Sequence, residues 1–272
     1  MIGATYGLIV SGLTLVFSVM RIVNFAHGEF YMLGGFIAYY LFAQAGIPYF
    51  LTLMAGFVAL GLLGLGLERV VFRPFRGQLL GAFIVSLGLS MILQNLAEQS
   101  FGIAGKHIPS AFPGNFIMGS VSFSAERMAI VIISAILLIG LHFFLQRIKV
   151  GQAMRAVAQE SEAAVLGGIN VNRISGFTMA LGSGLAGLAG ALLGPVFYVD
   201  PWMGSPIIMK AFVIIIVGGM GSIPGAIVVS LAFGFIESFG GFFLNPAAVS
   251  LIFFGTLALF LIFRPGGIFG HE

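Results

Sequence analysis

The sequence has little charge: only 8% of its 272 residues are Asp, Glu, Lys or Arg, whereas 59% are hydrophobic. A soluble globular domain carries about 25% charged residues. Most side chains here must therefore face lipid or other membrane helices. The composition excludes an ordinary soluble protein and indicates an integral, polytopic membrane protein.

Cysteine is absent altogether, which excludes disulfides and thiolate metal sites. The sequence indicates no other metal site and no cofactor. The net charge of +3 comes from basic residues on particular loops and predicts no nucleic-acid-binding patch. A cleavable signal peptide is not expected either, because no basic region precedes the first apolar run.

Catalytic patterns are also missing. The sequence contains no G-x-x-x-x-G-K-S/T phosphate loop, so the chain is not expected to hydrolyse ATP. It shows no convincing nucleophile–base set and no pair of acids at helical spacing within an apolar run. An intramembrane enzyme is therefore disfavoured, and we expect the protein not to be an enzyme.

Long apolar runs fill most of the chain and predict an all-α polytopic membrane protein of about eight transmembrane helices, forming one domain over residues 1–272. Two of the helices should be broken or re-entrant, near residues 24–28 and 218–225. At 24–28, polar residues separate two apolar runs too closely for a water-exposed loop. At 218–225, the preceding run of about ten residues would reach only about 15 Å as a helix. Such breaks are tolerated where protein or a cavity surrounds them.

The forty glycines lie mostly within the apolar runs, where small residues allow helices to approach closely. Gly182, Ala186 and Gly190 share one face of a predicted helix and should form a packing surface. In the run 79–97, Ser86, Gly88 and Ser90 are expected at helix contacts. Interhelical hydrogen bonds are expected from Gln94 and Asn95.

The longest polar stretch, residues 146–173, fixes the predicted orientation. It holds four of the 12 Lys and Arg residues, and short basic loops of membrane proteins lie in the cytoplasm. This loop, the basic loop at 68–77 and Arg264 should therefore lie inside, and the base-poor segments 98–126 and 195–207 outside, in the periplasm. Counting spans backward places Met1 outside.

The polar stretch also predicts two short helices. Ala153, Ala156 and Val157 follow helical spacing in the first. In the second, Ser161 can cap the N-terminus, Glu162 lies in the first turn, and Gly167 and Gly168 end the helix. About two turns are marginal in water, so this helix needs a surface to rest on, and its small face, Ala163 and Ala164, allows close approach. It is either a connector packed on the protein itself or a docking helix for a cytoplasmic subunit.

Polar residues within membrane runs are candidates for the translocation path, because they are costly in lipid. At the first break, Asn24, His27 and Glu29 either support the backbone, with Glu29 paired to Arg21, or line the path; a proton relay is disfavoured. At the second break, the glycine-rich turn should be a helix terminus near the path, where free N–H groups could meet a carboxylate. Its candidate residues are Gly218, Gly219, Gly221 and Ser222. Glu237 either lines the path or is a buried pair.

Glu162-Ala163-Ala164 followed by Gly168 matches the EAA-x-x-x-G signature of ABC-importer permeases. The whole chain resembles one branch of that class, the LivH-type permeases of branched-chain amino acid ABC importers. The matching segments follow the family order: residues 21–34, 68–74, 151–170, 210–225 and 264–267. Family members usually begin further upstream of Thr5-Tyr6, so the N-terminal helix is expected to be shorter here or the start site to lie upstream.

The resemblance implies a permease in the bacterial inner membrane that pairs with a second, LivM-like permease. Two cytoplasmic ATPase subunits would power it, coupled through Ser161, Glu162, Ala163, Ala164 and Gly168. A periplasmic substrate-binding protein would deliver the amino acid. Two alternatives stay open: the same permease class carrying urea or short amides, and an ion-coupled secondary carrier, in which broken helices are also typical.

Overall fold

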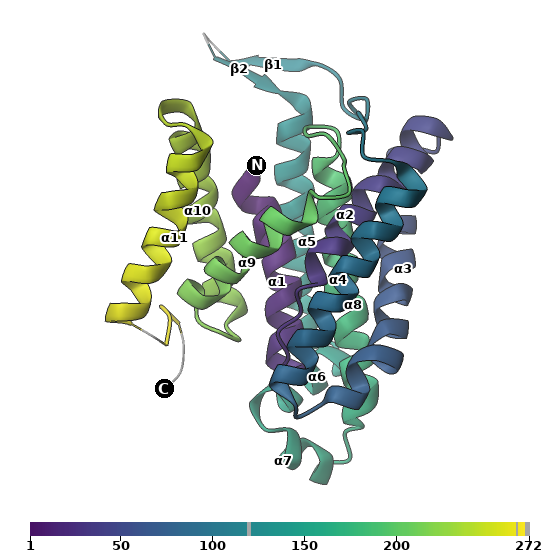
Figure 1. The fold of residues 1–272 in the computed structure, drawn as a ribbon, viewed down its shortest axis with the longest axis vertical. Helices are drawn as coiled ribbons and strands as arrows, with labels where there is room; N and C mark the ends of the chain where they lie inside the picture. The colour runs from purple at the N-terminus through teal and green to yellow at the C-terminus, as the bar shows by residue number, and fades with distance from the viewer. Residues whose placement is uncertain (119–120, 265, 270–272) are drawn as a thin grey trace.

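The computed structural model describes residues 1–118, 121–264 and 266–269. Residues 119–120 of the expected outer segment and Pro265 of the C-terminal motif lie outside this range. The fold is almost entirely helical, as predicted (Figure 1). The α-helices are α1 Ile2–Met20, α2 His27–Ala38, α3 Tyr49–Leu67, α4 Leu79–Phe101, α5 Ala125–Arg147, α6 Lys149–Gln159, α7 Ser161–Leu166, α8 Val171–Leu193, α9 Gly204–Gly218, α10 Ile223–Phe243 and α11 Pro246–Phe263.

Within the described residues, six helical segments are long and apolar enough to cross a membrane: α1, α3 with its extension, α4, α5, α8 and α10. Two shorter apolar helices, Gly204–Gly218 and Ala248–Phe263, accompany them. The prediction of about eight membrane helices is therefore confirmed. Short π- and 3-10 turns lengthen two helices beyond their α-helical part. They are η1 Tyr39–Gln44 after α2, and η2 Glu68–Phe72 and η3 Arg73–Phe75 after α3.

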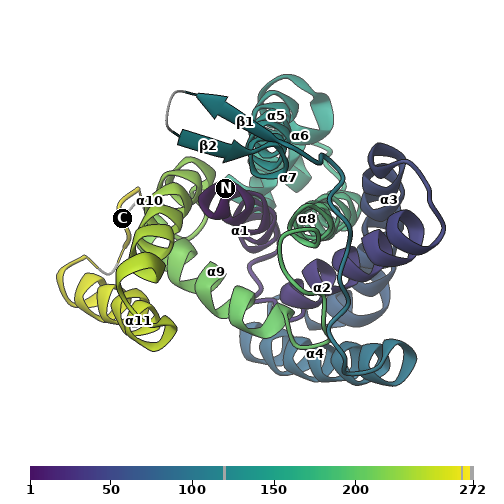
Figure 2. The ribbon, with the colours of Figure 1, turned by 90° about the horizontal axis from the view of Figure 1, so that it is seen from above.

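The central helices are α1 and α8. Viewed from above, α1, α2, α8 and α9 lie in the middle, with α3 and α4 on one side and α10 and α11 on the other (Figure 2). α8 packs against α1, α2 and α3, and α1 also packs against α10. Most residues of α1 and α8 are buried inside the chain, whereas α4 and α5 are largely exposed, as expected of helices that face lipid or a partner subunit.

Glycines allow the central helices to touch backbone to backbone. A Cβ on Gly190 would lie 1.8 Å from the carbonyl oxygen of Tyr31 in α2, and one on Gly182 would lie 2.9 Å from the carbonyl oxygen of Gly12 in α1. Ala186, between them, is fully buried. The predicted packing stripe is confirmed, and it lets α8 approach two neighbours along one face. The expected contact at Gly88 is wrong, because no atom lies within 4 Å of its Cβ position.

The predicted outer segment contains an antiparallel hairpin that the sequence did not predict. Strands β1 Asn115–Met118 and β2 Val121–Ser124 pair, with Phe116 opposite Phe123. A main-chain bridge between Lys106 and Val199, with N–O distances of 2.8 and 2.9 Å, joins this segment to the loop before α9. The two segments expected on one side of the membrane are thus hydrogen-bonded to each other.

The opposite end of the molecule carries α6 and α7, below the ends of α1 and α8 (Figure 1). The turns after α3 lie at this end too, because Arg73 and Arg76 there contact Asn172 at the start of α8. The two basic loops expected inside, residues 68–77 and 146–173, therefore lie at one end, away from the hairpin.

Both predicted breaks are present. Residues 21–26 separate α1 from α2, and residues 219–222 separate α9 from α10. α9 has 15 residues, longer than the expected ten because it begins at Gly204 instead of Lys210; at about 22 Å it is still shorter than a full crossing. α10, with 21 residues, is long enough to cross. A re-entrant course for this pair stays a prediction.

Candidate functional site

Helix α6 packs against α5, α8 and α1 of the same chain. Its buried residues are Gly151, Met154 and Val157, which follow helical spacing, with Ala153 and Ala156 partly buried beside them. Gly151 permits the contact, because a Cβ there would lie 2.3 Å from the carbonyl oxygen of Phe144 in α5. The first predicted loop helix is confirmed, and it forms a packed base for α7.

Helix α7 has six residues and ends at Gly167, followed by Gly168 in the left-handed conformation with φ 80°. Glu162 lies in its first turn, where a negative charge favours the helix dipole. These features were predicted. The expected cap was wrong: Glu160 occupies the N-cap position in extended conformation, without a side-chain capping bond, and Ser161 is the first helical residue.

The two faces of α7 differ in exposure. Ala164 is only 6% exposed because it packs against the protein itself, so it is not available to a partner; the expected two-alanine docking face is wrong in this respect. Glu162 and Ala163 are exposed, and Leu166, one turn further on, is 90% exposed. Residues three and four apart share a face of a helix. The outward face of α7 therefore consists of Glu162, Ala163 and Leu166.

The sequence pattern did not predict the exposed leucine, although Val165 and Leu166 occupy variable positions within the EAA-x-x-x-G signature. Two adjacent exposed apolar side chains form a small apolar patch at the tip of α7. Val165 is also 56% exposed. This apolar tip, beside the Glu162 carboxylate, is the type of surface that a protein partner covers.

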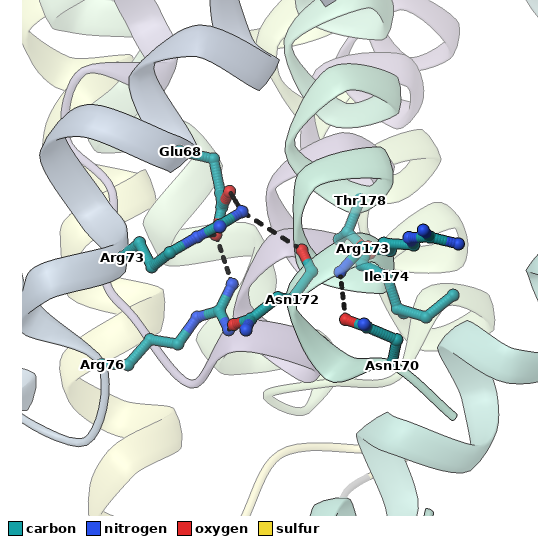
Figure 3. Close-up of polar contacts among 8 residues, drawn as sticks. All are labelled: Glu68, Arg73, Arg76, Asn170, Asn172, Arg173, Ile174 and Thr178. Carbon is teal, nitrogen blue, oxygen red and sulfur yellow. Dashed lines mark hydrogen bonds and ion pairs between the residues drawn. The ribbon is translucent and has the colours of Figure 1, made fainter. Parts of the chain in front are cut away.

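A buried carboxylate ties the neighbouring segments together (Figure 3). Glu68, fully buried at the end of α3, accepts a hydrogen bond from Arg73 Nη2 at 2.8 Å and a second one from Arg76 Nη2. Arg76 also donates through Nη1 to the side chain of Asn172 at the start of α8. The sequence predicted only a basic loop here. The turns η2 and η3 fold the two arginines back onto Glu68. The sequence pattern alone did not predict these ion pairs.

The start of α8 is capped within the same cluster. The side-chain oxygen of Asn170 accepts a hydrogen bond from the backbone N–H of Arg173 at 3.1 Å (Figure 3). α7 ends four residues before Asn170, so the segment between the short helix and α8 is fixed at its far end. Asn172 in turn accepts the hydrogen bond from Arg76, so the start of α8 is joined to the end of α3.

We expect Glu68→Gln to destabilise the protein by about 1–3 kcal/mol, because two arginines lose their shared anionic acceptor while keeping partial access to water. For a chain of this size that lowers the Tm by roughly 2–4 °C per kcal/mol, measurable by thermal unfolding of the detergent-purified protein. Glu98→Gln, the same change at an acid without an ion pair among the described residues, is the control. Equal Tm values for the two variants would contradict the bracing role.

The polar residues of the first break lie inside the protein. Asn24, His27 and Glu29 are all fully buried. Ring nitrogen Nε2 of His27 lies 3.1 Å from the carbonyl oxygen of Ile9, and Asn24 Nδ2 lies 3.8 Å from the sulfur of Met179. These contacts join the break to α1 and α8. Both residues thus hold the region of the break against neighbouring helices, and their support of the broken backbone itself stays a prediction.

Glu29 does not pair with Arg21 as expected. Its Oε1 accepts hydrogen bonds from Ser90 and Gln94 of α4, each at 2.8 Å, and Gln94 also donates to Ser205 of α9 at 2.7 Å. Arg21 instead ends α1 in the left-handed conformation and points to α6. The interhelical role predicted for Ser90 and Gln94 is confirmed.

Of two further predictions about α4, one is confirmed and one is wrong. Ser86 accepts a hydrogen bond from the backbone N–H of Phe25 at 3.1 Å and lies 3.2 Å from the carbonyl oxygen of Val23, so its expected contact with another element is confirmed. Asn95 donates to Met91 within its own helix. Its expected interhelical bond is therefore wrong.

At the second break, Gly219 and Gly221 adopt positive φ values of 101° and 97°, which glycine alone accommodates readily. Ser222 caps α10 by accepting the N–H of Gly225 at 3.2 Å. Gly218 packs backbone to backbone on Gly225. The four predicted residues thus build the sharp turn between the two helices, as a helix-terminus element should.

Glu237 forms an ion pair, as one of the two alternatives expected, but the pair is only partly buried, with the Lys210 and Glu237 side chains 22% and 20% exposed. Lys210 Nζ lies 2.6 Å from its Oε1, and Tyr6 donates to its Oε2 at 2.6 Å. The cluster joins α10, α9 and α1. A charge satisfied twice in this way is stabilised within an apolar bundle.

The two breaks meet at one apolar cavity of about 290 Å³ between α1, α9 and α11. The first break contributes Ile22, Val23 and Phe25, and the second contributes Met220. The remaining walls are also apolar: Leu13, Phe17, Met209, Phe212, Val213, Ile215, Ile216, Phe254 and Leu257. The sequence predicted the polar residues of the breaks as candidates for the translocation path. In the structure, the apolar residues of the breaks line the cavity instead.

Comparison with known proteins now gives the family. The family described as "branched-chain amino acid transport system / permease component" matches residues 1–262. The permease protein BraD of Pseudomonas aeruginosa is 37% identical over 99% of this chain and 93% of its own length. LivH of Salmonella typhimurium and LivH of Escherichia coli, both named high-affinity branched-chain amino acid transport system permease proteins, are 34% identical over 99% of this chain and 92% of their own lengths. No solved structure matches.

These relatives are components of transport systems and not enzymes. The match covers nearly the whole chain, includes both breaks and α7, and agrees with six helices able to cross a membrane. The chain therefore belongs to the branched-chain amino acid transport system permease family and is a multi-pass inner-membrane transport component.

Proposed function

We propose that this chain is the permease subunit of an ATP-driven importer that moves branched-chain amino acids into the cell. In this proposal it pairs with a second, LivM-like permease, two cytoplasmic ATPase subunits bind below, and a periplasmic binding protein delivers the substrate. The names of the relatives support the substrate class. Residues 146–173 would lie in the cytoplasm, and 98–126 and 195–207 in the periplasm, where the Lys106–Val199 bridge joins them into one docking face.

The cavity shared by the two breaks carries the proposal. Its walls are aliphatic, aromatic and methionine side chains, which suit the branched aliphatic side chain of leucine, isoleucine or valine. The ammonium and carboxylate groups of such a substrate find no partner in these walls, and neither do the polar groups of urea or a short amide. The alternative of an amide carrier is disfavoured by the relatives, which are named branched-chain amino acid permeases.

The translocation path would pass this cavity, with Asn24, His27 and Glu29 holding the first break in shape from behind. Gly218, Gly219, Gly221 and Ser222 would shape the second break, and Glu237 would fix α10 against α9. Broken helices at a substrate path can change shape with little loss of packing. Selectivity would lie mainly in the binding protein, because the walls of the cavity offer only apolar contacts.

Energy would enter through α7. Glu162 and Ala163 would contact the ATPase together with Leu166, while Ser161, Ala164 and Gly168 would set the position of the helix on the permease. The clamp of Glu68 and its arginines would pass the motion to α3 and α8. Alternating access would then follow from movement of these helices around the cavity.

The test is ATP-dependent uptake of labelled leucine into proteoliposomes that hold the purified complex. We expect isoleucine and valine to compete, and urea and acetamide not to. Leu257→Trp, which fills the cavity, should lower uptake by about tenfold or more, since overpacking costs roughly 1–3 kcal/mol. Leu261→Trp, one turn along α11 and outside the cavity, should leave uptake unchanged. Uptake that continues without ATP and collapses with the proton gradient would refute the proposal in favour of an ion-coupled carrier.

A further inference from the structure

Two further cavities lie at the end of the molecule that carries α6. One, of about 460 Å³, is bordered by Arg21, Arg155, Ser18, Gln159 and Ser222. The other, of about 490 Å³, runs between α1, α5 and α10. Ser18, Arg155, Ala158, Gly221 and Ser222 line both. The two cavities are therefore parts of one continuous groove.

The groove is amphipathic along its length. Its inner part is walled mainly by apolar residues of three membrane helices, among them Leu15, Leu138, Ile227 and Val228, and it also contains His142 and Gln146 of α5. Its outer part carries two guanidinium groups. This is the polarity of a phospholipid, with a polar head at the membrane surface and acyl chains toward the bilayer centre. The groove is distinct from the cavity at the breaks, and Phe17 and Met220 line both and lie between them.

The charge of the outer part is positive. Arg21 uses Nη2 in one hydrogen bond, to the carbonyl oxygen of Ala158 at 3.0 Å, and keeps its other N–H groups free to donate. Within the described part of the chain, Arg155 has no hydrogen-bond or ion-pair partner. No acid lines either cavity. An anionic head would therefore meet two cations and no carboxylate in the wall.

The position of Arg21 is held by the backbone. It is the one non-glycine residue with positive φ among the described residues, at φ 53° and ψ 37°. This conformation ends α1 abruptly, and it directs the guanidinium toward α6, away from the buried carboxylate of Glu29. A strained backbone at a basic residue indicates that its placement matters.

We propose that this groove binds an anionic phospholipid of the cytoplasmic leaflet, with its phosphate between Arg21 and Arg155 and an acyl chain along Leu138 and Val228. Basic pockets between membrane helices on the cytoplasmic side have this preference, and the anionic lipids of that leaflet are attracted by about 1 kcal/mol per basic residue near the surface. The lipid would lie among α1, α5, α6 and α10, of which α1 packs against the other three.

The test is native mass spectrometry of the full-length protein with its copurifying subunits, titrated with dioleoyl phosphatidylglycerol or dioleoyl phosphatidylcholine. The wild type should bind one phosphatidylglycerol more tightly than phosphatidylcholine. Arg155→Gln should weaken phosphatidylglycerol binding about fivefold and leave phosphatidylcholine unchanged. Val228→Trp, which narrows the apolar part, should weaken both lipids. Arg147→Gln, the same change at a basic residue outside the groove, is the matched control.

Three outcomes would overturn the proposal. The first is equal affinity of the wild type for the two lipids. The second is binding of glycerol phosphate as tightly as phosphatidylglycerol, which would make the groove a site for a small anion. The third is an Arg155→Gln variant that loses a protein subunit but keeps its lipid affinity, which would make the groove a subunit contact.

Discussion

Gly190→Leu should prevent the protein from folding in the membrane. A Cβ at this position would lie 1.8 Å from the Tyr31 carbonyl oxygen and 2.7 Å from its carbon. The obstacle is backbone in the core of the bundle, so no rotamer change relieves it. The cost should exceed the roughly 1–3 kcal/mol typical of overpacked cores, because α2 and α8 would have to separate along their whole contact.

The measurement is the yield of monodisperse protein after detergent extraction, followed by fluorescence size-exclusion chromatography of a fusion protein. Gly140→Leu is the matched control: it lies in α5, where no atom is found within 4 Å of the Cβ position. That variant should fold as well as the wild type, since leucine favours a helix over glycine by several tenths of a kcal/mol. A similar yield for both variants would show that the close α2–α8 contact is not required.

Glu162→Lys should abolish ATP-driven transport while the permease still folds and inserts. Glu162 is exposed and bonds to no other residue within the described chain, so its reversal costs the isolated permease little. If Glu162 is a hot spot of the interface, its reversal costs about 2 kcal/mol or more, which is roughly a thirtyfold loss of ATPase affinity. Leucine uptake by proteoliposomes should fall to the level seen without ATP.

The matched control for this prediction is Glu160→Lys, an equal change of charge at an exposed acid two residues earlier. Glu160 contributes its backbone to the start of α7 but does not share the outward face. Uptake should stay close to that of the wild type. If both variants lose transport equally, a general effect of positive charge on this loop would replace the specific role of Glu162.

The sequence allowed the helical fold to be predicted because its signals are local. Runs of apolar residues, two interruptions and a basic loop determine how many helices form and which ends lie together. The stripe of Gly182, Ala186 and Gly190 could be recognised because residues four apart share a helix face. The small helix α7 could be placed from its flanking glycines.

What the sequence could not show depends on distant partners. Glu29 was expected to pair with Arg21, eight residues away, but α4 supplies Ser90 and Gln94 from more than sixty residues further along the chain. The same limit applies to Glu68, whose arginines needed two irregular turns to reach it. Which side chains of α7 are exposed could not be predicted either. Whether Ala164 or Leu166 faces outward depends on how α7 packs against α6 and α8.

The role of α7 as the entry point for energy is tested most directly by copurification of the ATPase subunits with the tagged permease. The Glu162→Lys permease should be recovered in normal amount from the membrane but with its ATPases lost, whereas the Glu160→Lys permease should keep them. Normal copurification of the ATPases with Glu162→Lys would contradict the proposed docking of the ATPase on the outward face of α7.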